Sequence, residues 1–436
     1  MRESRKKLLA LTLTFSSFLS IFGEKNVKLS RVGDGYAATS VNTAIFRANS
    51  LTTHGDTQYI CYYDPDGYVT LGKRTLDSDE WQTKRTQYKG NVTDGHNVIS
   101  MAVDGEGYIH VSFDHHGDKL HYARSIQPGS LELGDLEPMT GNLENDVTYP
   151  EFHNMPDGGL LFAYRSGASG SGNMVINRYD TTTRMWSRVH DSLIDGEGAR
   201  NAYWQMYADQ FGTLHLSWVW RETWLVETNH DICYARSKDG GLSWQRSNGE
   251  PYQLPITEST AEVVWKVPQK SELINQTSMT ADPLGNPLIA TYWRDSVSAI
   301  PQYRLVYHNG EKWKMEQVSK RVTPFSLSGG GTKMIPMSRP RIISDGKHYY
   351  YIFRDAERGS VVSMAKKSVD SAEWVVKDLT DFSVSAWEPT IDNELWRNTK
   401  RLHIFVQNSL QGDGEKVTTA APQHVYVANC VIEDCP

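Results

Sequence analysis

The stretch His96-Asn-Val-Ile-Ser-Met-Ala-Val-Asp104, followed after a glycine-rich turn by Tyr108-Ile-His-Val-Ser-Phe113, decides the fold. Two apolar runs of strand length, separated by turn residues, predict an antiparallel pair of strands. Comparable pairs recur at residues 41–49 and 58–63, 149–157 and 160–164, 201–209 and 213–218, 275–282 and 287–293, 339–345 and 348–353, and 387–392 and 401–406. With the first pair these make seven units, which predict an all-β, seven-bladed β-propeller.

A second landmark lies between these units. Ser237-Lys-Asp-Gly-Gly-Leu-Ser-Trp244 matches the Asp-box pattern S-x-D-x-G-x-[ST]-W. In such a turn the Asp caps backbone amides, glycine supplies positive φ, and the Trp packs between sheets. Weaker copies end at Trp81, Trp186, Trp313 and Trp374. We also expect residues 28–32 to pair with residues 424–430 and close the ring, which leaves no exposed edge strand at the seam.

Composition limits the partners. The 436 residues carry a formal net charge of −7, which argues against a nucleic acid or an anionic membrane as a general partner. The basic residues Arg2, Arg5, Lys6 and Lys7, followed by the apolar stretch 8–22, predict a signal peptide over residues 1–23. A membrane anchor is the less favoured alternative, because the stretch is short. We therefore expect a secreted propeller domain over residues 24–436, with no membrane association after signal removal.

The cysteines do not form a disulfide scaffold, since there are only four. Cys430 and Cys435 lie close together in the sequence, and we expect them to pair in an oxidising compartment. Cys61 and Cys233 lie within predicted strands, where we expect buried thiols.

In a propeller blade, the start of the first strand and the end of the second lie on one face near the axis. The strand starts carry Asn42, His96, Tyr149, Asn201, Tyr203, Gln276, Arg339 and Glu388, and the strand ends carry His115, His116, Arg165, Arg221, Arg294 and Arg354. Four successive second strands thus end in arginine after an aromatic residue. Guanidinium groups pair with carboxylate or sulfate, so the pattern predicts a pocket for an anionic ligand.

The alternative is that each arginine pairs with a neighbouring acid, since Glu222, Asp295 and Asp355 directly follow three of them. Arg165 has no acid beside it and is the strongest candidate for a ligand contact. The serine- and glycine-rich residues 166–172 that follow are expected to form a rim loop, because a phosphate-binding loop would end in Gly-Lys-[ST].

The histidines raise a catalytic and a metal interpretation. His96 begins an inner strand, His115 and His116 end its neighbour, and Tyr149 starts the next blade, so these side chains should lie close together. A metal held by His96 with His115 or His116 lacks a convincing further ligand. His230 and Cys233 are a second candidate pair for a structural Zn²⁺. We expect no required cofactor, and a structural Zn or Ca ion stays an open alternative.

Two segments carry a family resemblance. Residues 93–116, with Asp94-Gly-His-Asn97 and Asp114-His-His116, and residues 148–152 with Phe162-Ala-Tyr-Arg165 resemble the BNR-repeat propeller family, which includes propeller-type ulvan lyases. The resemblance implies β-elimination on ulvan, a sulfated polysaccharide containing uronic acid. It assigns proton transfer to His96 and Tyr149 and neutralisation of the uronate to Arg165. A further pocket tyrosine would be Tyr203 or Tyr207.

An acidic polysaccharide is therefore the expected partner, and a lyase is the expected activity. Which of the histidine and the tyrosine is the base stays open, because glucuronate and iduronate present the C5 hydrogen on opposite faces. A glycoside hydrolase acting on rhamnosyl-glucuronic acid would need two flanking carboxylates. A sialidase would need an early Arg-Ile-Pro signature, which the sequence lacks. A non-catalytic glycan-binding propeller would keep the arginines without needing the His–Tyr pair.

Overall fold

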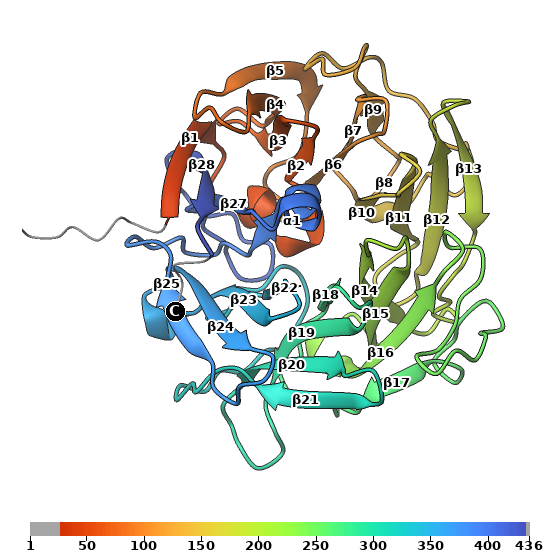
Figure 1. Ribbon diagram of the computed structural model, residues 1–436, viewed down its shortest axis with the longest axis vertical. Helices are drawn as coiled ribbons and strands as arrows, with labels where there is room; N and C mark the ends of the chain where they lie inside the picture. Colours follow the sequence, from red (N-terminus) through yellow and green to blue (C-terminus); the bar gives the residue numbers. More distant parts are fainter. Residues whose placement is uncertain (1–26, 433–436) are drawn as a thin grey trace, which may run out of the picture.

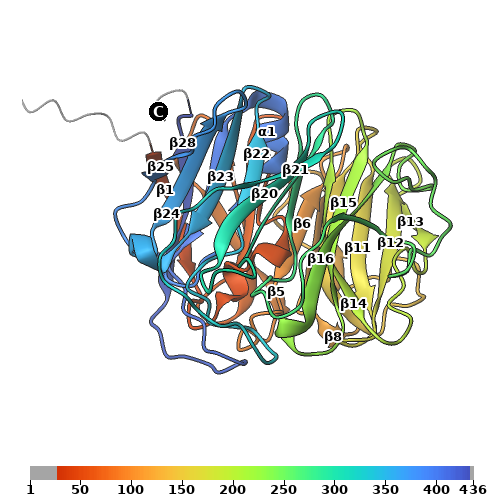
Figure 2. The same cartoon turned by 90° about the horizontal axis from the view of Figure 1, so that it is seen from below.

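Six of the seven predicted pairs of strands form the inner part of one antiparallel sheet each, because the apolar side chains of both strands are buried against neighbouring sheets. The computed structural model describes residues 27–432. In it, seven sheets stand around one axis as the blades of a β-propeller (Figure 1), which confirms the predicted fold. Seen from the side, strand β8 (His116–Asp118) and helix α1 (Asn393–Thr399) lie at opposite ends of the ring (Figure 2).

The strands follow chain order within each blade. Blade 1 holds β2 (Leu51–His54), β3 (Thr57–Tyr63), β4 (Tyr68–Thr75) and β5 (Gln82–Lys89). Blade 2 holds β6 (Ile99–Val103), β7 (Ile109–Phe113) and β9 (Tyr122–Arg124). Blade 3 holds β10 (Val147–Asn154), β11 (Leu160–Ser166), β12 (Asn173–Asp180) and β13 (Met185–His190), with β8 added beside β10. Blade 4 holds β14 (Asn201–Ala208), β15 (Leu214–Arg221), β16 (Asn229–Ser237) and β17 (Glu262–Trp265).

The second half of the ring repeats this order. Blade 5 holds β18 (Ser278–Ala281), β19 (Pro287–Trp293), β20 (Gln302–His308) and β21 (Trp313–Gln317). Blade 6 holds β22 (Arg341–Ser344), β23 (His348–Arg354), β24 (Val362–Ser368) and β25 (Val375–Asp378). Blade 7 holds β26 (Thr390–Ile391), β27 (Leu402–Gln407) and β28 (Gln423–Cys430), with β1 (Val27–Gly35) as its outer strand. Short 3-10 helices are η1 (Ser40–Asn42), η2 (Ile45–Arg47), η3 (Val226–Thr228) and η4 (Ala356–Arg358).

The two ends of the described chain close the ring. β1 pairs antiparallel with β28, with Val27 opposite Cys430 and Gly35 opposite Gln423. This is the predicted closure: the first described strand completes the last blade by backbone hydrogen bonds, and the chain then continues into blade 1. The outer edge of blade 7 is therefore formed by the first strand of the chain.

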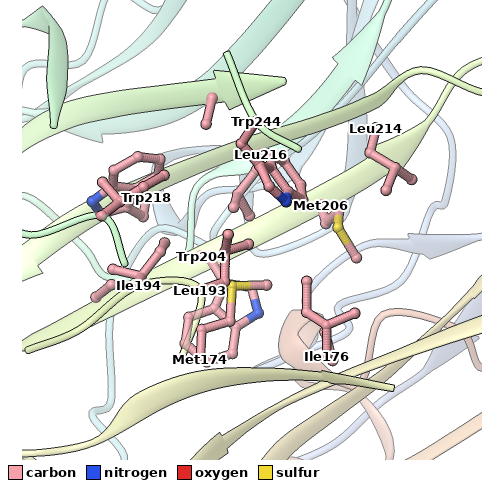
Figure 3. Close-up of a cluster of buried hydrophobic side chains, with 14 of the residues drawn as sticks. Met174, Ile176, Leu193, Ile194, Trp204, Met206, Leu214, Leu216, Trp218 and Trp244 are labelled. Atoms are coloured by element: carbon pink, nitrogen blue, oxygen red, sulfur yellow. The ribbon is translucent and has the colours of Figure 1, made fainter. Parts of the chain in front are cut away.

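Large apolar side chains fill the space between blades. Figure 3 shows the cluster between blades 3 and 4, where Trp204, Trp218 and Trp244 meet Met174 and Ile176. Trp244 is fully buried and donates its indole N–H to the carbonyl of Gly241 at 3.1 Å.

The Asp-box turn that ends in this tryptophan has the predicted geometry. Asp239 accepts from the backbone N–H of Ser243 at 2.9 Å, and Gly240 has φ +74°. The capping carboxylate and the positive φ both hold the turn that delivers the tryptophan to the space between the blades.

The sequence prediction was wrong at the inner strand of blade 1. Residues 41–49 form η1 and η2 instead of a strand, and β2 begins at Leu51. Polar side chains take over the backbone bonding here, since Asn42 accepts from the N–H of Tyr63 at 2.7 Å. The buried guanidinium of Arg47 donates to the carbonyl oxygens of Ile99 and Cys61. This coiled segment lies near the ring centre (Figure 1), away from α1 along the axis (Figure 2), and it carries Phe46 into the pocket described below.

Other predictions concern the signal peptide, the cysteines and a membrane-spanning segment. The signal peptide over residues 1–23 and the partner Cys435 lie outside the described residues. Cys61 and Cys233 are buried, as expected. Among residues 27–432, no helix is long and apolar enough to cross a bilayer.

Candidate functional site

A cavity of about 800 Å³ opens at the end of the ring where β8 lies. Its lining brings together most of the residues that the strand-start and strand-end pattern singled out, from blades 2, 3, 4, 6 and 7. His96, His116, Tyr149, Arg165, Tyr203, Arg221, Arg339, Arg354 and Glu388 all line it. The predicted convergence of these side chains is therefore confirmed.

Arg165 is the least satisfied charge in the cavity. Its side chain is 3% exposed, and its Nε and Nη1 atoms have no hydrogen-bond partner within residues 27–432. The guanidinium carbon lies 5.0 Å from the centre of the Tyr149 ring, a cation–π contact. A Cβ on Gly172 would come within 2.6 Å of Arg165 Cγ, so this glycine is required for the loop to pack on the arginine. A buried cation without a counter-charge is costly, and an anionic ligand would offset that cost.

Tyr149 is held by a strained backbone. Its φ is 55°, in the left-handed region, and the pairing of β10 with β11 shifts register between Thr148 and Glu151. Such a conformation costs roughly 1–3 kcal/mol for a residue other than glycine. The irregularity turns the Tyr149 ring into the cavity, where it lies 6.0 Å from the His96 ring and 5.9 Å from the Tyr203 ring. Burial raises the pKa of Tyr149 above its ordinary value.

Asp94 joins the two pocket histidines. Its carboxylate contacts His96 Nδ1 at 2.8 Å and His116 Nδ1 at 2.6 Å, and the two imidazole rings stack at 4.0 Å. Glu415 Oε1 lies 3.2 Å from His96 Nδ1. Burial alone would lower the pKa of His96, but hydrogen bonds to Asp94 and Glu415 outweigh it and raise the pKa to about 9. His96 is therefore an imidazolium at neutral pH, and all its recorded ring hydrogen bonds within the described chain run through Nδ1.

Tyr203 has the opposite electrostatic setting from Tyr149. Burial would raise its pKa, but the guanidinium groups of Arg221 and Arg165 outweigh burial and lower the pKa of Tyr203 to about 8. The Arg221 guanidinium carbon lies 5.3 Å from the Tyr203 ring centre. Ser169 of the rim loop contacts the Tyr203 hydroxyl at 3.3 Å. The same cavity therefore holds Tyr203, which loses its proton easily, and His96, which keeps its proton at neutral pH.

The arginines on the other side of the cavity are already paired. Arg339 makes an ion pair with Glu388 at 2.7 Å, and both side chains are buried. Arg354 donates to the carbonyl oxygens of Ile335 at 2.8 Å and Trp387 at 3.4 Å. The capacity to bind an added anion is thus concentrated on blades 3 and 4.

Two residues predicted to bind substrate lie behind the cavity wall. The His115 ring is fully buried and accepts from the N–H of His121 at 2.8 Å. Burial lowers the pKa of His115 well below its ordinary value, so it stays neutral. Asn201 is also fully buried and accepts from the N–H of Gly172 at 2.5 Å. His116 begins β8 and lines the cavity, whereas His115 lies just before that strand and is buried.

Two more predicted contacts lie elsewhere. Tyr207 lines a small cavity next to α1, at the far end of the channel from the pocket. β14 runs along the channel, and four residues separate Tyr203 from Tyr207 by roughly 13 Å, so only Tyr203 can reach the pocket. Arg294 follows β19 where the chain turns outward, and it pairs with Glu272 and with the carbonyl oxygen of Lys270 at 2.6 Å. Arg294 therefore has an acid partner, but that partner is Glu272 and not the adjacent Asp295, which pairs with Arg304.

The predicted zinc pair does not converge. His230 contacts Glu222 at 2.9 Å and Asp231 at 3.3 Å, whereas Cys233 is buried in the apolar cluster between blades 3 and 4. In residues 27–432, the one group of His, Cys, Asp and Glu with metal-ligand spacing is Asp94, His96 and His116, whose ligand atoms lie within 4.8 Å of one another. These atoms already satisfy one another by hydrogen bonds.

Several pocket residues escaped the sequence analysis. Asp94 stands two residues before His96, a spacing typical of an Asx turn, and its carboxylate accepts from the His96 N–H at 2.8 Å. This two-residue spacing could have identified Asp94 from the sequence. Phe46, Trp224, Thr332 and Glu415 come from irregular segments with no periodicity to mark them.

Fold and cavity together define a seven-bladed β-propeller with a cationic, tyrosine-lined central pocket. The chain belongs to the BNR repeat-containing family, whose model matches residues 57–321, more than half of its length. An ulvan lyase (long isoform) of Alteromonas sp is 28% identical over 245 residues, 44% of this chain and 24% of the relative. The chain thus spans about a quarter of the length of such relatives.

Solved structures share the fold. A PL25 ulvan lyase bound to -[GlcA(1-4)Rha3S]- superposes with a TM-score of 0.66 at 18% identity, covering 90% of this chain and 97% of the other. A polysaccharide lyase, Uly1, superposes with a TM-score of 0.65 at 15% identity, covering 95% and 94%. At these identities the superpositions establish the propeller architecture.

Proposed function

We propose that the protein is a secreted polysaccharide lyase that cleaves an acidic, uronate-containing and sulfated polysaccharide resembling ulvan by β-elimination. The observation that carries the proposal is Arg165, a buried guanidinium with unsatisfied N–H groups, set against Tyr149 in the same pocket as His96. The similarity to ulvan lyases, and the GlcA-Rha3S ligand of one structural neighbour, point to the same substrate class.

Arg165 supplies the electrostatic part of the reaction. The C5 proton of a uronate is weakly acidic while the adjacent carboxylate is charged. A guanidinium that pairs with this carboxylate stabilises the enolate-like state formed when the proton leaves. Water competes poorly at a side chain that is 3% exposed, so the interaction acts at nearly full strength. Arg221, whose Nε also lacks a partner in the described chain, offers a second positive group for a neighbouring sulfate or uronate.

Proton transfer is divided between the tyrosine pair and His96. A base must be deprotonated before reaction, and Tyr203, with a pKa of about 8, is the more readily ionised of the two tyrosines. Tyr149, whose ring lies 5.9 Å from the Tyr203 ring, keeps its proton more firmly because burial raises its pKa. His96 enters as the imidazolium and donates its proton to the departing O4. The C5–H and C4–O4 bonds break, a C4=C5 double bond forms, and no cofactor takes part.

A hydrolase finds less support in the cavity. Glu388 is committed to Arg339 by an ion pair at 2.7 Å, and Asp94 is committed to two histidines. Two carboxylates free to flank a glycosidic bond are what a hydrolase needs.

Incubation with ulvan tests the function. Appearance of ultraviolet absorbance from an unsaturated uronate is expected, because only elimination creates that chromophore. New reducing ends without the chromophore would instead identify a hydrolase, and binding without either product would identify a glycan-binding propeller. His96→Ala should abolish chromophore formation while the circular dichroism spectrum stays unchanged. Lys84→Ala, an exposed substitution on the outer strand of blade 1, is the matched control and should keep full activity.

A further inference from the structure

The connection between β21 and β22 crosses the mouth of the cavity. Its residues 329–334 are called the bridge loop here, and five of the six line the pocket. The first anchor is blade 4, where the N–H of Val226 donates to Gly329 O at 2.9 Å and the N–H of Gly329 donates to Glu227 at 2.9 Å. Gly330 then lies against the Trp224 indole, so closely that a Cβ would come within 2.6 Å of the ring.

The second anchor lies across the ring. Thr332 Oγ1 is 3.3 Å from His96 Nδ1 on blade 2, and both the N–H and the hydroxyl of Thr332 donate to Glu415. Lys333 pairs at 2.9 Å with Asp413 in the connection between β27 and β28 of blade 7. Blade 2 stands opposite blades 5 and 6, which the loop connects, so the loop has to pass over the axis to reach His96 (Figure 1).

The bridge loop therefore runs as a chord from Trp224 on blade 4 to His96 on blade 2. The cationic part of the pocket, with Arg165 and Arg221, lies on blades 3 and 4 within the arc that this chord encloses. On the far side of the chord, Arg339 and Arg354 already have partners. A polymer lying across the whole site would have to pass one of the anchored ends of the loop. Beyond that end it would no longer contact Arg165 and Arg221, the pocket arginines that keep N–H groups without a partner in the described chain.

We infer that the bridge loop restricts the enzyme to chain ends and short oligosaccharides, so that it acts as an exolyase on its polyanionic substrate. The inference rests on the proposed lyase function and specifies the form of substrate that the same site takes. The anionic terminal sugars enter the enclosed arc beneath the loop, and Arg165 and Arg221 hold them there. The interior of a long chain is excluded by the contacts of the loop with Trp224 and His96.

The test follows chromophore formation and chain length together, using the full-length protein and ulvan. Chromophore should appear with the shortest product from the first time point, while most of the polymer keeps its original size. Ulvan shortened by ultrasound to give tenfold more ends at equal mass should react about tenfold faster. An early collapse of mean chain length, with chromophore present, would overturn the inference and leave the lyase proposal standing. Absence of chromophore would instead count against the lyase itself.

A deletion variant tests whether the bridge loop causes the restriction to chain ends. Deletion of residues 330–333 should let the enzyme cut within chains, so that mean chain length falls several-fold faster per bond cleaved. Deletion of residues 296–299, which line a separate cavity beside Arg294, is the matched control and should keep the end-directed pattern. A folded 330–333 deletion that still cuts only from ends would overturn the inference. If that variant does not fold, the wild-type chain-length measurements decide alone.

Discussion

Replacing Arg165 by methionine should stabilise the protein and destroy its activity. Several kcal/mol are lost when a cation is desolvated in a real protein, and the contact with Tyr149 at 5.0 Å returns roughly 0.5–2 kcal/mol. Nε and Nη1 of Arg165 make no hydrogen bonds within the described chain, so little offsets this cost. The free energy of unfolding of the Arg165→Met variant should therefore be about 1–3 kcal/mol higher than that of the wild type.

Activity should change in the opposite direction. Removing one charge-stabilising group from a buried site typically costs about 10²–10³ in kcat, and we expect at least that loss for β-elimination. Urea denaturation measures the first effect, and chromophore release from ulvan measures the second.

Arg354→Met is the control for the stability effect. Arg354 is similarly buried but already bonded to Ile335 O and Trp387 O, so its removal should lower the free energy of unfolding. If Arg165→Met unfolds more easily than the wild type, or if it keeps more than a tenth of the wild-type rate, the argument from an unpaired charge is refuted.

Four further outcomes are expected. The kcat/KM for ulvan should rise as pH passes about 8, where Tyr203 loses its proton, and fall above about 9, where His96 loses its own; a flat profile in this window would exclude this division of roles. Trp224→Ala should raise KM roughly three- to tenfold with kcat unchanged, since an exposed indole on the pocket rim offers a stacking surface worth roughly 0.5–1.5 kcal/mol, whereas Phe211→Ala at a distant turn should leave KM unchanged. Treatment with EDTA should leave the rate unchanged, and loss of activity restored by a divalent ion would assign a metal to the pocket. Asp239→Ala should lower the free energy of unfolding by about 1–3 kcal/mol, because the Asp-box amides lose their acceptor; calorimetry will measure it.

The repeat made the fold predictable from sequence, because strand pairs with similar turns recur in all seven blades. It also made the pocket predictable, since strand starts and ends meet at one face, and His96, Tyr149 and Arg165 indeed line one cavity. The same rule failed for Arg294. An arginine after an aromatic residue reaches the pocket only while the chain continues along the axis, and at Arg294 it turns towards Glu272.

Other features depended on contacts that a local pattern does not contain. Whether Tyr203 or Tyr207 faces the pocket is decided by where β14 lies along the channel, because both point to the same side of the strand. Glu415 contacts His96 although the two residues are more than 300 positions apart in the sequence, and Glu415 stands in a loop without apolar periodicity. The coiled segment in place of the first inner strand follows from the side-chain bonds of Asn42 and Arg47, which replace strand pairing.

The pairing of β1 with β28 places Val27 directly opposite Cys430, so the two extremities of the propeller are next-door neighbours. A short peptide could link them, and the chain could then be opened at an outer turn of any other blade. Such circular permutants should assemble the same ring, because each sheet would keep every one of its strands. The order in which the blades are synthesised would differ in these permutants, however. A blade other than blade 7 would then be the one completed by the last strand. Comparing their refolding rates would measure how much of the barrier to folding belongs to bringing the two ends together.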